Sequence, residues 1–292
     1  MSAMRAQRTR GARRAALTAA LMGTLLACSR EPAFRRQADE EGLLDAIRET
    51  LLASVEAEKS AVLATTDEES LEMARESRRL TGTIDGRLGD LRARVEADDR
   101  PAVTERFAAF VARWEELKSV DARLLALAVA NTNLKAMRLS ARDGLDAVER
   151  FGVGLEDMER ASSDPQARRL LSAASIAALR EQTLLLLHVP SADDGEMTRL
   201  EKRMRDLAAS VDRALAALRA DGEVPSGALD TAVEAWAEHR RIAAEVVKLS
   251  RENTNVRSFD VSVHEKRTAM RACLDALAAL RDAVASSPQA NR

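Results

Sequence analysis

The chain has 292 residues, among them 45 Lys or Arg, 47 Asp or Glu, 12 Gly and 6 Pro, and it has no Tyr. This composition is rich in Ala, Leu, Arg and Glu, which indicates long packed helices and argues against a strand-rich fold. The formal net charge is −2, so the chain lacks the basic surface that binding to nucleic-acid phosphates requires.

Residues 1–27 have the features of a secretory signal peptide. Five Arg residues precede an apolar run of thirteen residues, 15–27, which is too short to span a bilayer because a spanning helix needs about 20 residues. Removal of this segment leaves 40 basic and 47 acidic residues, a net charge of −7. Arg13-Arg14 lacks the flanking residues of a twin-arginine signal, so twin-arginine export is the less favoured route.

The apolar run ends at a cysteine. Its last residues, Leu25-Leu26-Ala27-Cys28, resemble the bacterial lipobox, which implies cleavage before Cys28 and attachment of a diacylglycerol to its thiol. Ser29 follows, and by resemblance to enterobacterial sorting this favours the outer membrane over the inner. We therefore expect a lipoprotein of the bacterial cell envelope that faces the periplasm and is tethered through residues 28–37. An ordinary signal peptide is the alternative, and it would leave a soluble protein in the same compartment.

Two stretches of the chain share one pattern: Trp, sixteen residues, Asn-Thr-Asn, six residues and Ser. The copies are 122 residues apart, and Trp occurs nowhere else in the chain. Self-similarity over a long fixed period indicates an internal duplication, so one structural unit is expected twice. The first copy consists of Trp114, Asn131, Thr132, Asn133 and Ser140, and the second of Trp236, Asn253, Thr254, Asn255 and Ser262.

Apolar residues recur three and four residues apart along most of the chain, which is the heptad pattern of packed helices. One such series runs from Leu117 to Val148, and its copy keeps the pattern with polar exceptions. Turn-forming sequences with Asp, Gly and Pro separate the periodic segments. The predicted helices cover residues 38–97, 100–151, 166–220 and 226–286.

Each predicted helix has roughly 50 to 60 residues and a length of about 75 to 90 Å at 1.5 Å per residue. Short turns make neighbouring helices antiparallel, and the apolar seams must be buried. We therefore predict an all-α protein, an elongated up-down-up-down four-helix bundle made of two duplicated long helical hairpins. Repeat 1 covers residues 38–152, residues 153–165 connect the hairpins, and repeat 2 covers residues 166–287, with both hairpins in one bundle domain.

The first predicted helix of each repeat is interrupted, at Thr65-Thr66-Asp67 and at His188-Val189-Pro190-Ser191. Pro190 removes a backbone hydrogen bond, so we expect a kink in the chain there. Both interruptions lie about as far before their hairpin turn as Asn-Thr-Asn lies after it. We predict a polar layer at this level, in which Asn131 meets Asn253 and Arg138 approaches Asp260. The layer would comprise Thr66, Asn131, Thr132, Arg138, Pro190, Asn253, Thr254 and Asp260.

Three interpretations of the polar layer remain open. A buried Asn sets helix register at some cost in stability, which is the best attested role of a polar core residue. Unwound backbone together with Asn side chains also makes a small cavity for a polar ligand. In the third interpretation the Asn side chains face water.

One family resemblance covers roughly residues 40–285. The segment Glu58-Lys59-Ser60-Ala61-Val62-Leu63, an acidic interruption and Phe110-x3-Trp114 resemble the helical sensor domain of methyl-accepting chemotaxis receptors, and Leu249 to Val256 is similar to its last helix. The resemblance implies a four-helix-bundle sensor domain that pairs side by side as a homodimer. The chain departs from the family because it has no second membrane span, linker domain or signalling hairpin. The ligand-binding arginines of aspartate receptors have no counterpart that can be placed here.

No pattern of catalytic or cofactor-binding residues is evident. None of His188, His239 and His264 has Glu three residues before it, as a di-iron bundle requires, and Cys-x-x-Cys-His for covalent haem is absent. Phosphate-binding glycine loops, Gly-x-Ser-x-Gly and His-Glu-x-x-His are absent too. Cys273 lies in an Ala- and Leu-rich stretch typical of a small core residue. We therefore expect no enzyme, no metal and no cofactor.

The preferred interpretation is a non-catalytic, lipid-anchored periplasmic bundle, sensor-like and ligand-binding, that acts through a membrane or envelope partner. The alternative is an envelope scaffold or protein-interaction lipoprotein, in which the polar layer only sets register. The expected partners are the membrane through lipidated Cys28, an envelope protein, a small polar ligand and, by the resemblance, a second copy of the chain. No nucleic acid is expected.

Overall fold

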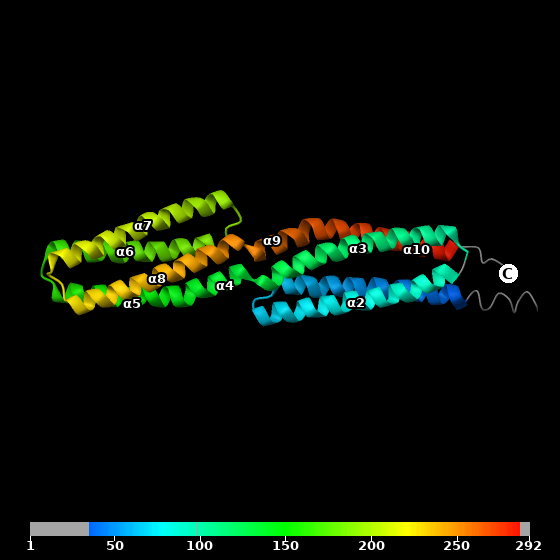
Figure 1. The fold of residues 1–292 in the computed structure, drawn as a ribbon, viewed down its shortest axis with the longest axis horizontal. Coiled ribbons are helices and arrows are strands. Elements are labelled where there is room, and N and C mark those ends of the chain that lie inside the picture. Colours follow the sequence, from blue (N-terminus) through cyan, green and yellow to red (C-terminus); the bar gives the residue numbers. More distant parts are fainter. Residues whose placement is uncertain (1–34, 98, 287–292) are drawn as a thin grey trace, which may run out of the picture. The chain divides into compact units, whose positions relative to one another are not determined.

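The computed structural model describes residues 35–97 and 99–286, and these residues are all-α, as predicted, with no strand among them. A first helix covers residues 35–63 (Figure 1). Further along are α2 (Asp67–Ala97), α3 (Pro101–Ala130), α4 (Thr132–Leu139), the π-helix η1 (Ser140–Gly144), α5 (Leu145–Ala161), α6 (Pro165–His188), α7 (Asp194–Asp221), α8 (Ser226–Glu252), α9 (Thr254–Val261), the π-helix η2 (Ser262–Lys266) and α10 (Arg267–Ser286). The predicted signal peptide and Cys28 lie outside the described residues.

The described residues form two compact units. Of the described residues, unit 1 contains 35–58, 75–97, 99–121 and 265–286. Unit 2 contains residues 59–74 and 122–264. These units do not follow the predicted repeats 38–152 and 166–287, because each unit takes segments from both.

Side-chain caps set where several helices begin. The Asp164 carboxylate accepts hydrogen bonds from the amides of Gln166 and Ala167 at 3.1 and 2.7 Å, and Pro165 occupies the first turn of α6. At α7, the Asp193 carboxylate accepts from the Glu196 amide at 2.9 Å. These Asp and Pro positions match the turn signals in the sequence.

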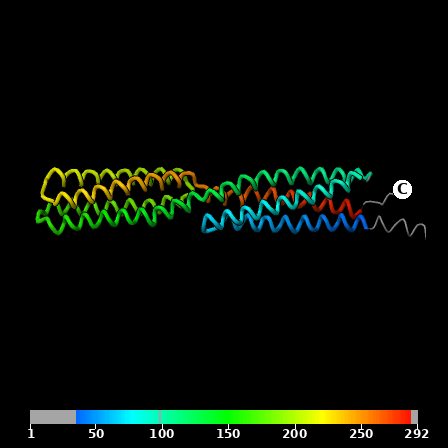
Figure 2. Tube along the Cα trace, turned by 60° about the horizontal axis from the view of Figure 1, so that its bottom comes forward, coloured from blue at the N-terminus to red at the C-terminus, as the bar shows by residue number. Residues whose placement is uncertain are grey.

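The predicted helices 38–97 and 166–220 do not continue through their interruptions, and the expected kink at Pro190 is wrong, because the chain reverses at residues 65–67 and 188–191. In unit 1, Arg94 pairs with Asp39 at 3.3 Å, so the end of α2 lies beside the start of the first helix. In unit 2, α6 and α7 lie side by side in both ribbon and tube views (Figures 1 and 2). Thr66 and Asp193 each cap a new helix, which a kinked continuous helix would not need.

The two other predicted long helices are also interrupted, at sites that the heptad pattern did not indicate. Asn131 separates α3 from α4 with φ 50° and ψ 36°, and Asn253 separates α8 from α9 with φ 52° and ψ 38°. They are the only non-glycine residues with positive φ among those described. Asn is one of the few residues that adopts this left-handed conformation routinely.

Helix α5 continues to Ala161, so most of the predicted connector 153–165 is helical. Gly154 lies inside α5 where a Cβ atom would come within 3.0 Å of the Ala232 Cβ atom and 3.2 Å of its backbone. This glycine therefore permits close approach of α5 and α8 and does not mark a turn. Gly152, two residues earlier, has nothing within 4 Å of its Cβ position.

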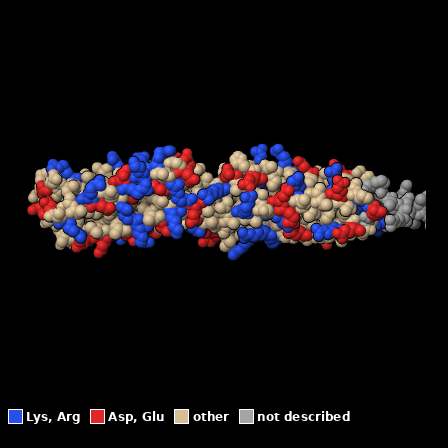
Figure 3. All heavy atoms as spheres, turned by 45° about the horizontal axis from the view of Figure 1, so that its top comes forward, with Lys and Arg blue, Asp and Glu red and all other residues tan. Residues whose placement is uncertain are grey.

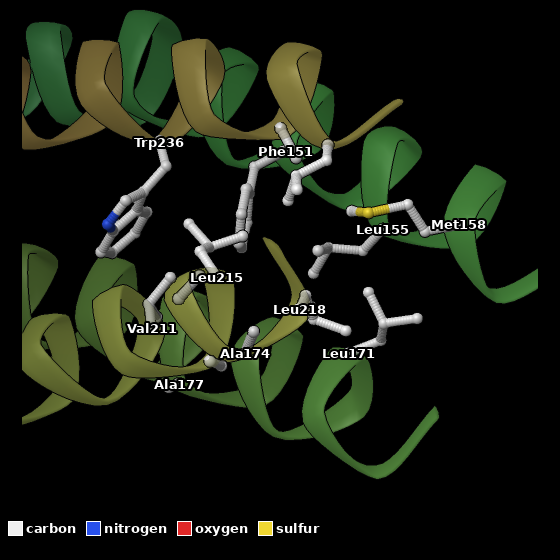
Figure 4. Packing of buried hydrophobic residues seen from close by; sticks show 14 of the residues in the cluster. Phe151, Leu155, Met158, Leu171, Ala174, Ala177, Val211, Leu215, Leu218 and Trp236 are labelled. Carbon is white, nitrogen blue, oxygen red and sulfur yellow. The ribbon is translucent and has the colours of Figure 1, made fainter. Parts of the chain in front are cut away.

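Each unit has its own apolar core. In unit 2, residues of α5, α6, α7 and α8 meet around Trp236, whose ring centroid lies 5.4 Å from that of Phe151 (Figure 4). Small side chains such as Ala174 and Ala177 let these helices pack closely. In unit 1, Trp114 is completely buried in a cluster built from the first helix, α2, α3 and α10.

Candidate functional site

The two Asn-Thr-Asn triplets lie against each other in unit 2, and we call the six residues the Asn-Thr-Asn clasp. Thr132 and Thr254 are at its centre. The Thr132 amide donates to the Thr254 hydroxyl at 3.0 Å, and the Thr254 amide donates to the Thr132 hydroxyl at 3.2 Å. The two hydroxyl oxygens are 3.1 Å apart. Each threonine thus satisfies an amide at the start of the other's helix, which has no partner within its own helix.

The four Asn side chains of the clasp repeat the same exchange. The Asn133 amide donates to Asn255 Oδ1 at 3.2 Å, and the Asn255 amide donates to Asn133 Oδ1 at 3.1 Å. The side-chain amides cross over: Asn133 Nδ2 donates to Asn253 Oδ1 at 2.8 Å, and Asn255 Nδ2 donates to Asn131 Oδ1 at 2.9 Å. The expected Asn131–Asn253 contact is therefore wrong, because each meets the last Asn of the other triplet.

The clasp also holds the turn between α6 and α7. Asn133 Nδ2 donates to the Val189 carbonyl at 2.8 Å, and Asn253 Nδ2 donates to the Ser191 carbonyl at 3.1 Å. Pro190, between these two carbonyls, is itself exposed. Thr66 is exposed too, and its hydroxyl accepts from the Glu69 amide at 3.1 Å, so it is a helix cap and not a member of the clasp.

The expected approach of Arg138 to Asp260 is also wrong. Arg138 pairs with Asp67 at 3.2 Å, and Asp260 lies 3.5 Å from His264 on the same helical surface. All four side chains are partly or fully exposed, so these pairs contribute little to stability.

The clasp is buried and nearly saturated with its own hydrogen bonds. Asn131 is 1% and Asn253 6% exposed, so the interpretation in which they face water is wrong. Asn131 Nδ2 is the one clasp side-chain atom that is buried without a hydrogen-bond partner among the described residues. Such an arrangement suits the setting of helix register, because a slip by one residue would leave several buried amides unpaired.

The repeated Trp residues are set in matching surroundings. The Trp114 indole N–H donates to Asp85 Oδ1 at 2.7 Å in unit 1, and the Trp236 indole N–H donates to Asp212 Oδ1 at 2.7 Å in unit 2. A cation four residues after each Trp lies over its ring, Lys118 at 5.7 Å and Arg240 at 6.0 Å from the centroid. The duplication therefore preserves a Trp–Asp–cation cluster in each unit.

Each unit also buries ionisable side chains beside its π-helix. In unit 1, Lys266 on η2 forms ion pairs with Asp121 and Glu58, and all three side chains are buried. Burial raises the pKa of the Asp121 carboxyl, while the nearby Lys266 ammonium opposes that shift. One cation thus neutralises part of the charge on two buried acids.

In unit 2 the corresponding region contains an acid and a histidine. Glu181 Oε2 lies 3.7 Å from His239 Nε2, and neither atom has a hydrogen-bond partner. The other ring nitrogen, His239 Nδ1, lies 3.3 Å from the Gly144 carbonyl on η1. Burial raises the pKa of Glu181 to about 7 and lowers the pKa of His239 to about 4. Between about pH 4 and 7 the protonated carboxyl and the uncharged imidazole are therefore the favoured forms of the pair.

A groove of about 170 Å³ opens between α7 and α8, and Glu181 lies in its floor. Its lining combines apolar residues such as Met204, Ala243 and Val247 with charged ones, the acid Glu201 and the cations Arg205 and Arg240. An engineered apolar cavity of about 150 Å³ holds a benzene molecule, so this groove has room for a ligand of similar size. The sequence did not indicate Glu181, since a single Glu in an apolar series reads as surface.

The outward side of α6 is unusually apolar. Between Ser172 and Leu187 the exposed residues of α6 carry one charge, that of Arg180, whereas the exposed Arg168 and Arg169 lie nearer the start of the helix. We call this set the α6 face: Ser172, Ala173, Ile176, Leu179, Arg180, Thr183, Leu186 and Leu187. Among the described residues, α6 is also the one helix long and apolar enough to cross a membrane, with mean hydropathy 1.4 and 44% of that window buried. Elsewhere basic and acidic side chains are interspersed, as Figure 3 shows for one side of the molecule.

No family model, curated protein or solved structure matches this chain. Within the described ranges, no group of three or more His, Cys, Asp or Glu side chains is placed to hold a metal ion. The site residues are therefore interpreted from their geometry. The clasp is closed on itself, whereas the α6 face and the groove over Glu181 are open to other molecules.

Proposed function

We propose that this chain is a lipid-anchored, non-catalytic helical protein of the bacterial envelope that acts by binding another protein through the α6 face. The observation that carries the proposal is the exposure of Ile176, Leu179, Leu186 and Leu187, which are 48%, 52%, 37% and 55% accessible. Contiguous exposed apolar residues on a soluble unit mark interaction surfaces, whereas scattered ones need no explanation. The clasp supports the proposal because it keeps the helices of unit 2 in one register.

The proposal includes a four-helix bundle in each unit. Unit 2 would consist of α5, α6, α7 and α8, whose side chains share one core cluster. Unit 1 would consist of the first helix, α2, α3 and α10. Anchoring through Cys28, export to the periplasm and sorting to the outer membrane belong to the same proposal, as does the absence of catalysis, of a cofactor and of nucleic-acid binding.

Anchoring is tested by labelling cells with a radioactive fatty acid. We expect the wild-type chain to be labelled and membrane-bound, and the Cys28→Ser variant to be unlabelled and released. Unchanged processing and unchanged membrane association of the variant would refute the lipid anchor.

The interaction function is tested with a photocrosslinking amino acid in intact cells. Placed at Leu186 on the α6 face, it should form an adduct with an envelope protein or with another copy of the chain. Placed at Lys59, which is exposed on the first helix, it should form none. Equal adducts at both positions, or none at Leu186, would contradict the proposal.

A sensor-like ligand-binding function is the second candidate, and the groove over Glu181 favours it. A carboxyl that is 3% exposed and has an unpaired oxygen is a suitable partner for a small ligand with N–H donors. A ligand at 100 times its dissociation constant should stabilise the chain by about 2.7 kcal/mol. A thermal-shift panel of amino acids, organic acids and polyamines tests this, and a shift that persists in Glu181→Gln would place the ligand elsewhere.

A further inference from the structure

The duplication supplies an internal comparison for α6. Helices α2 and α7 begin at Asp67 and Asp194, 127 residues apart. Their caps repeat at the same offset, because Thr66 accepts from the Glu69 amide and Asp193 accepts from the Glu196 amide. The Trp partners Asp85 and Asp212 share this offset as well. Within each first hairpin, residue n of the first copy therefore corresponds to residue n+127.

This offset places the first helix of the chain in register with α6. Four residues of the α6 face are uncharged where the first helix has a charge: Ser172, Ile176, Thr183 and Leu186 correspond to Asp45, Glu49, Glu56 and Lys59. Both helices pack one side into the core of their own unit, so burial does not account for this difference. The α6 face is therefore uncharged at positions where the first helix is charged. We infer that the α6 face is covered in the working protein.

The centre of the α6 face has the spacing of a coiled-coil seam. Ser172, Ile176, Leu179, Thr183 and Leu186 follow one another at intervals of four, three, four and three residues, and all are exposed. A seam with this period packs against a second helix that runs alongside it, with equivalent positions meeting when the helices are parallel. Flat binding of a lipid surface does not require this period.

The two edges of the α6 face differ in charge. The groove of about 410 Å³ between α5 and α6 is lined by Glu149 and Glu156 and by no cation. The groove of about 490 Å³ between α6 and α7 is lined by Arg180 and Arg203 with one acid, Asp206. Neither Glu149 nor Arg180 has an ion-pair partner among the described residues. The face thus has an apolar centre, an acidic edge and a basic edge.

We propose that the α6 face binds the same face of a second copy of the chain, with the two α6 helices parallel and a two-fold axis running along them. This symmetry puts the acidic edge of each copy opposite the basic edge of the other. Glu149 of each copy therefore approaches Arg180 of the other copy, which gives two such pairs in the dimer. It also keeps both lipid anchors on the same side of the dimer. The inference rests on the proposed function, because it names the partner of the α6 face.

Cysteine crosslinking in the native membrane tests the parallel arrangement in the full-length chain. Thr183 lies on the seam, so Thr183→Cys should form a disulfide-linked dimer under mild oxidation. Glu56→Cys, at the corresponding position of the first helix, is the matched control and should stay monomeric. The remaining thiol, Cys273, is buried and should not interfere. Absence of the Thr183→Cys dimer, or an equal yield of dimer from Glu56→Cys, overturns the proposal.

Charge exchange tests the edges. In the Thr183→Cys background, Arg180→Glu and Glu149→Arg should each lower the dimer yield several-fold, and the double variant should restore it. All of these positions are on the surface or line a surface groove, so folding should be preserved. Failure of the double variant to restore the dimer overturns the proposed edge pairing.

The outcomes also separate the dimer from the interaction function. If the photocrosslinker at Leu186 captures a different envelope protein while Thr183→Cys stays monomeric, the proposed dimer is wrong and the interaction function stands. If phospholipid vesicles shield the thiol at position 183 and no dimer forms, both the dimer and the protein-binding function of the α6 face are overturned.

Discussion

Thr132 and Thr254 form a reciprocal pair: the hydroxyl oxygen of each accepts a hydrogen bond from the backbone amide of the other, at 3.0 and 3.2 Å. They are 122 residues apart, which is the offset of the duplicated motif. An N-terminal amide of a helix usually finds its acceptor on a residue just before that helix. Here the acceptor comes from the other copy, so the cap of α4 depends on α9 and the cap of α9 depends on α4.

The first prediction concerns this exchange. Thr132→Val keeps the shape of the side chain but leaves the Thr254 amide buried without its acceptor, so the free energy of unfolding should fall by about 1 to 3 kcal/mol. Thr132→Ser keeps the hydroxyl and should lose less. Denaturant unfolding of both variants and of Thr132→Val with Thr254→Val measures the effect and the coupling. Equal stability of the Val and Ser variants would show that the hydroxyl is not needed.

The second prediction concerns the left-handed backbone of the clasp. In a helix interior a protein with Ala is more stable than the same protein with Gly, but for variants of Asn131 this order should reverse. Asn131→Gly and Asn131→Ala lose the same hydrogen bond from Asn255. Only in the Ala variant does a Cβ atom destabilise the backbone at φ 50°, by about 1 to 2 kcal/mol. Chemical denaturation should find Gly more stable by about 1 kcal/mol. The same comparison at Asn253 should agree, and Ala above Gly at both sites would exclude this backbone conformation.

The third prediction compares two glycines of α5. Gly152→Ala meets nothing within 4 Å and should raise the free energy of unfolding by about 0.5 to 1 kcal/mol, because Ala is the better helix former. Gly154→Ala places a Cβ atom 3.0 to 3.2 Å from Ala232 and should lower it by about 1 to 3 kcal/mol. Thermal unfolding of both variants gives the comparison. A stabilising Gly154→Ala would show that α5 and α8 are not in close contact.

The fourth prediction follows from the opposed pKa shifts of Glu181 and His239. The folded-state pKa of Glu181 is raised from 4.5 to about 7, so the folded state holds an extra proton in this window and stability falls as pH rises through it. The pKa of His239 is lowered from 6.5 to about 4, so the unfolded state holds the extra proton and stability falls as pH decreases through that window. Between about pH 4.5 and 6.5 the two contributions oppose each other.

Replacing one partner should expose the contribution of the other. Glu181→Gln should lose stability on acidification from pH 6.5 to 4, relative to wild type, by on the order of 1 to 2 kcal/mol. His239→Gln should instead lose stability as pH rises from 4.5 to 7. Urea unfolding across this pH range checks both slopes. Parallel profiles for the two variants would mean that Glu181 and His239 do not have these opposed shifts.

Much of the local structure was predictable from the residues alone. Asp164 with Pro165 marks a helix start because the carboxylate accepts amides of the first turn and Pro needs no donor there. The repeated Trp and Asn-Thr-Asn positions indicated equivalent surroundings, and the matching Asp85 and Asp212 partners show them. The burial of Asn131 and Asn253 followed from their place in the apolar series.

Chain reversal was not predictable in the same way. Pro190 is compatible with both a kink and a turn, since the loss of one backbone hydrogen bond does not set the direction of the next helix. That direction depends on whether α7 finds a better apolar surface beside α6 or beyond it. The contacts of Asn133 and Asn253 with the Val189 and Ser191 carbonyls stabilise the turn, and they come from residues distant in the chain.

The residues by themselves determined that this protein is helical, that it is duplicated and where several of its helices begin, because propensity, period and capping act over a few neighbouring positions. Only the tertiary structure decided which copy each Asn and Thr would bond, which side of α6 would stay uncovered and that Glu181 and His239 would share a buried site. Those outcomes depend on helices that meet across many residues, 58 for Glu181 and His239 and 122 for Thr132 and Thr254, and the free energy of such contacts is absent from any local pattern.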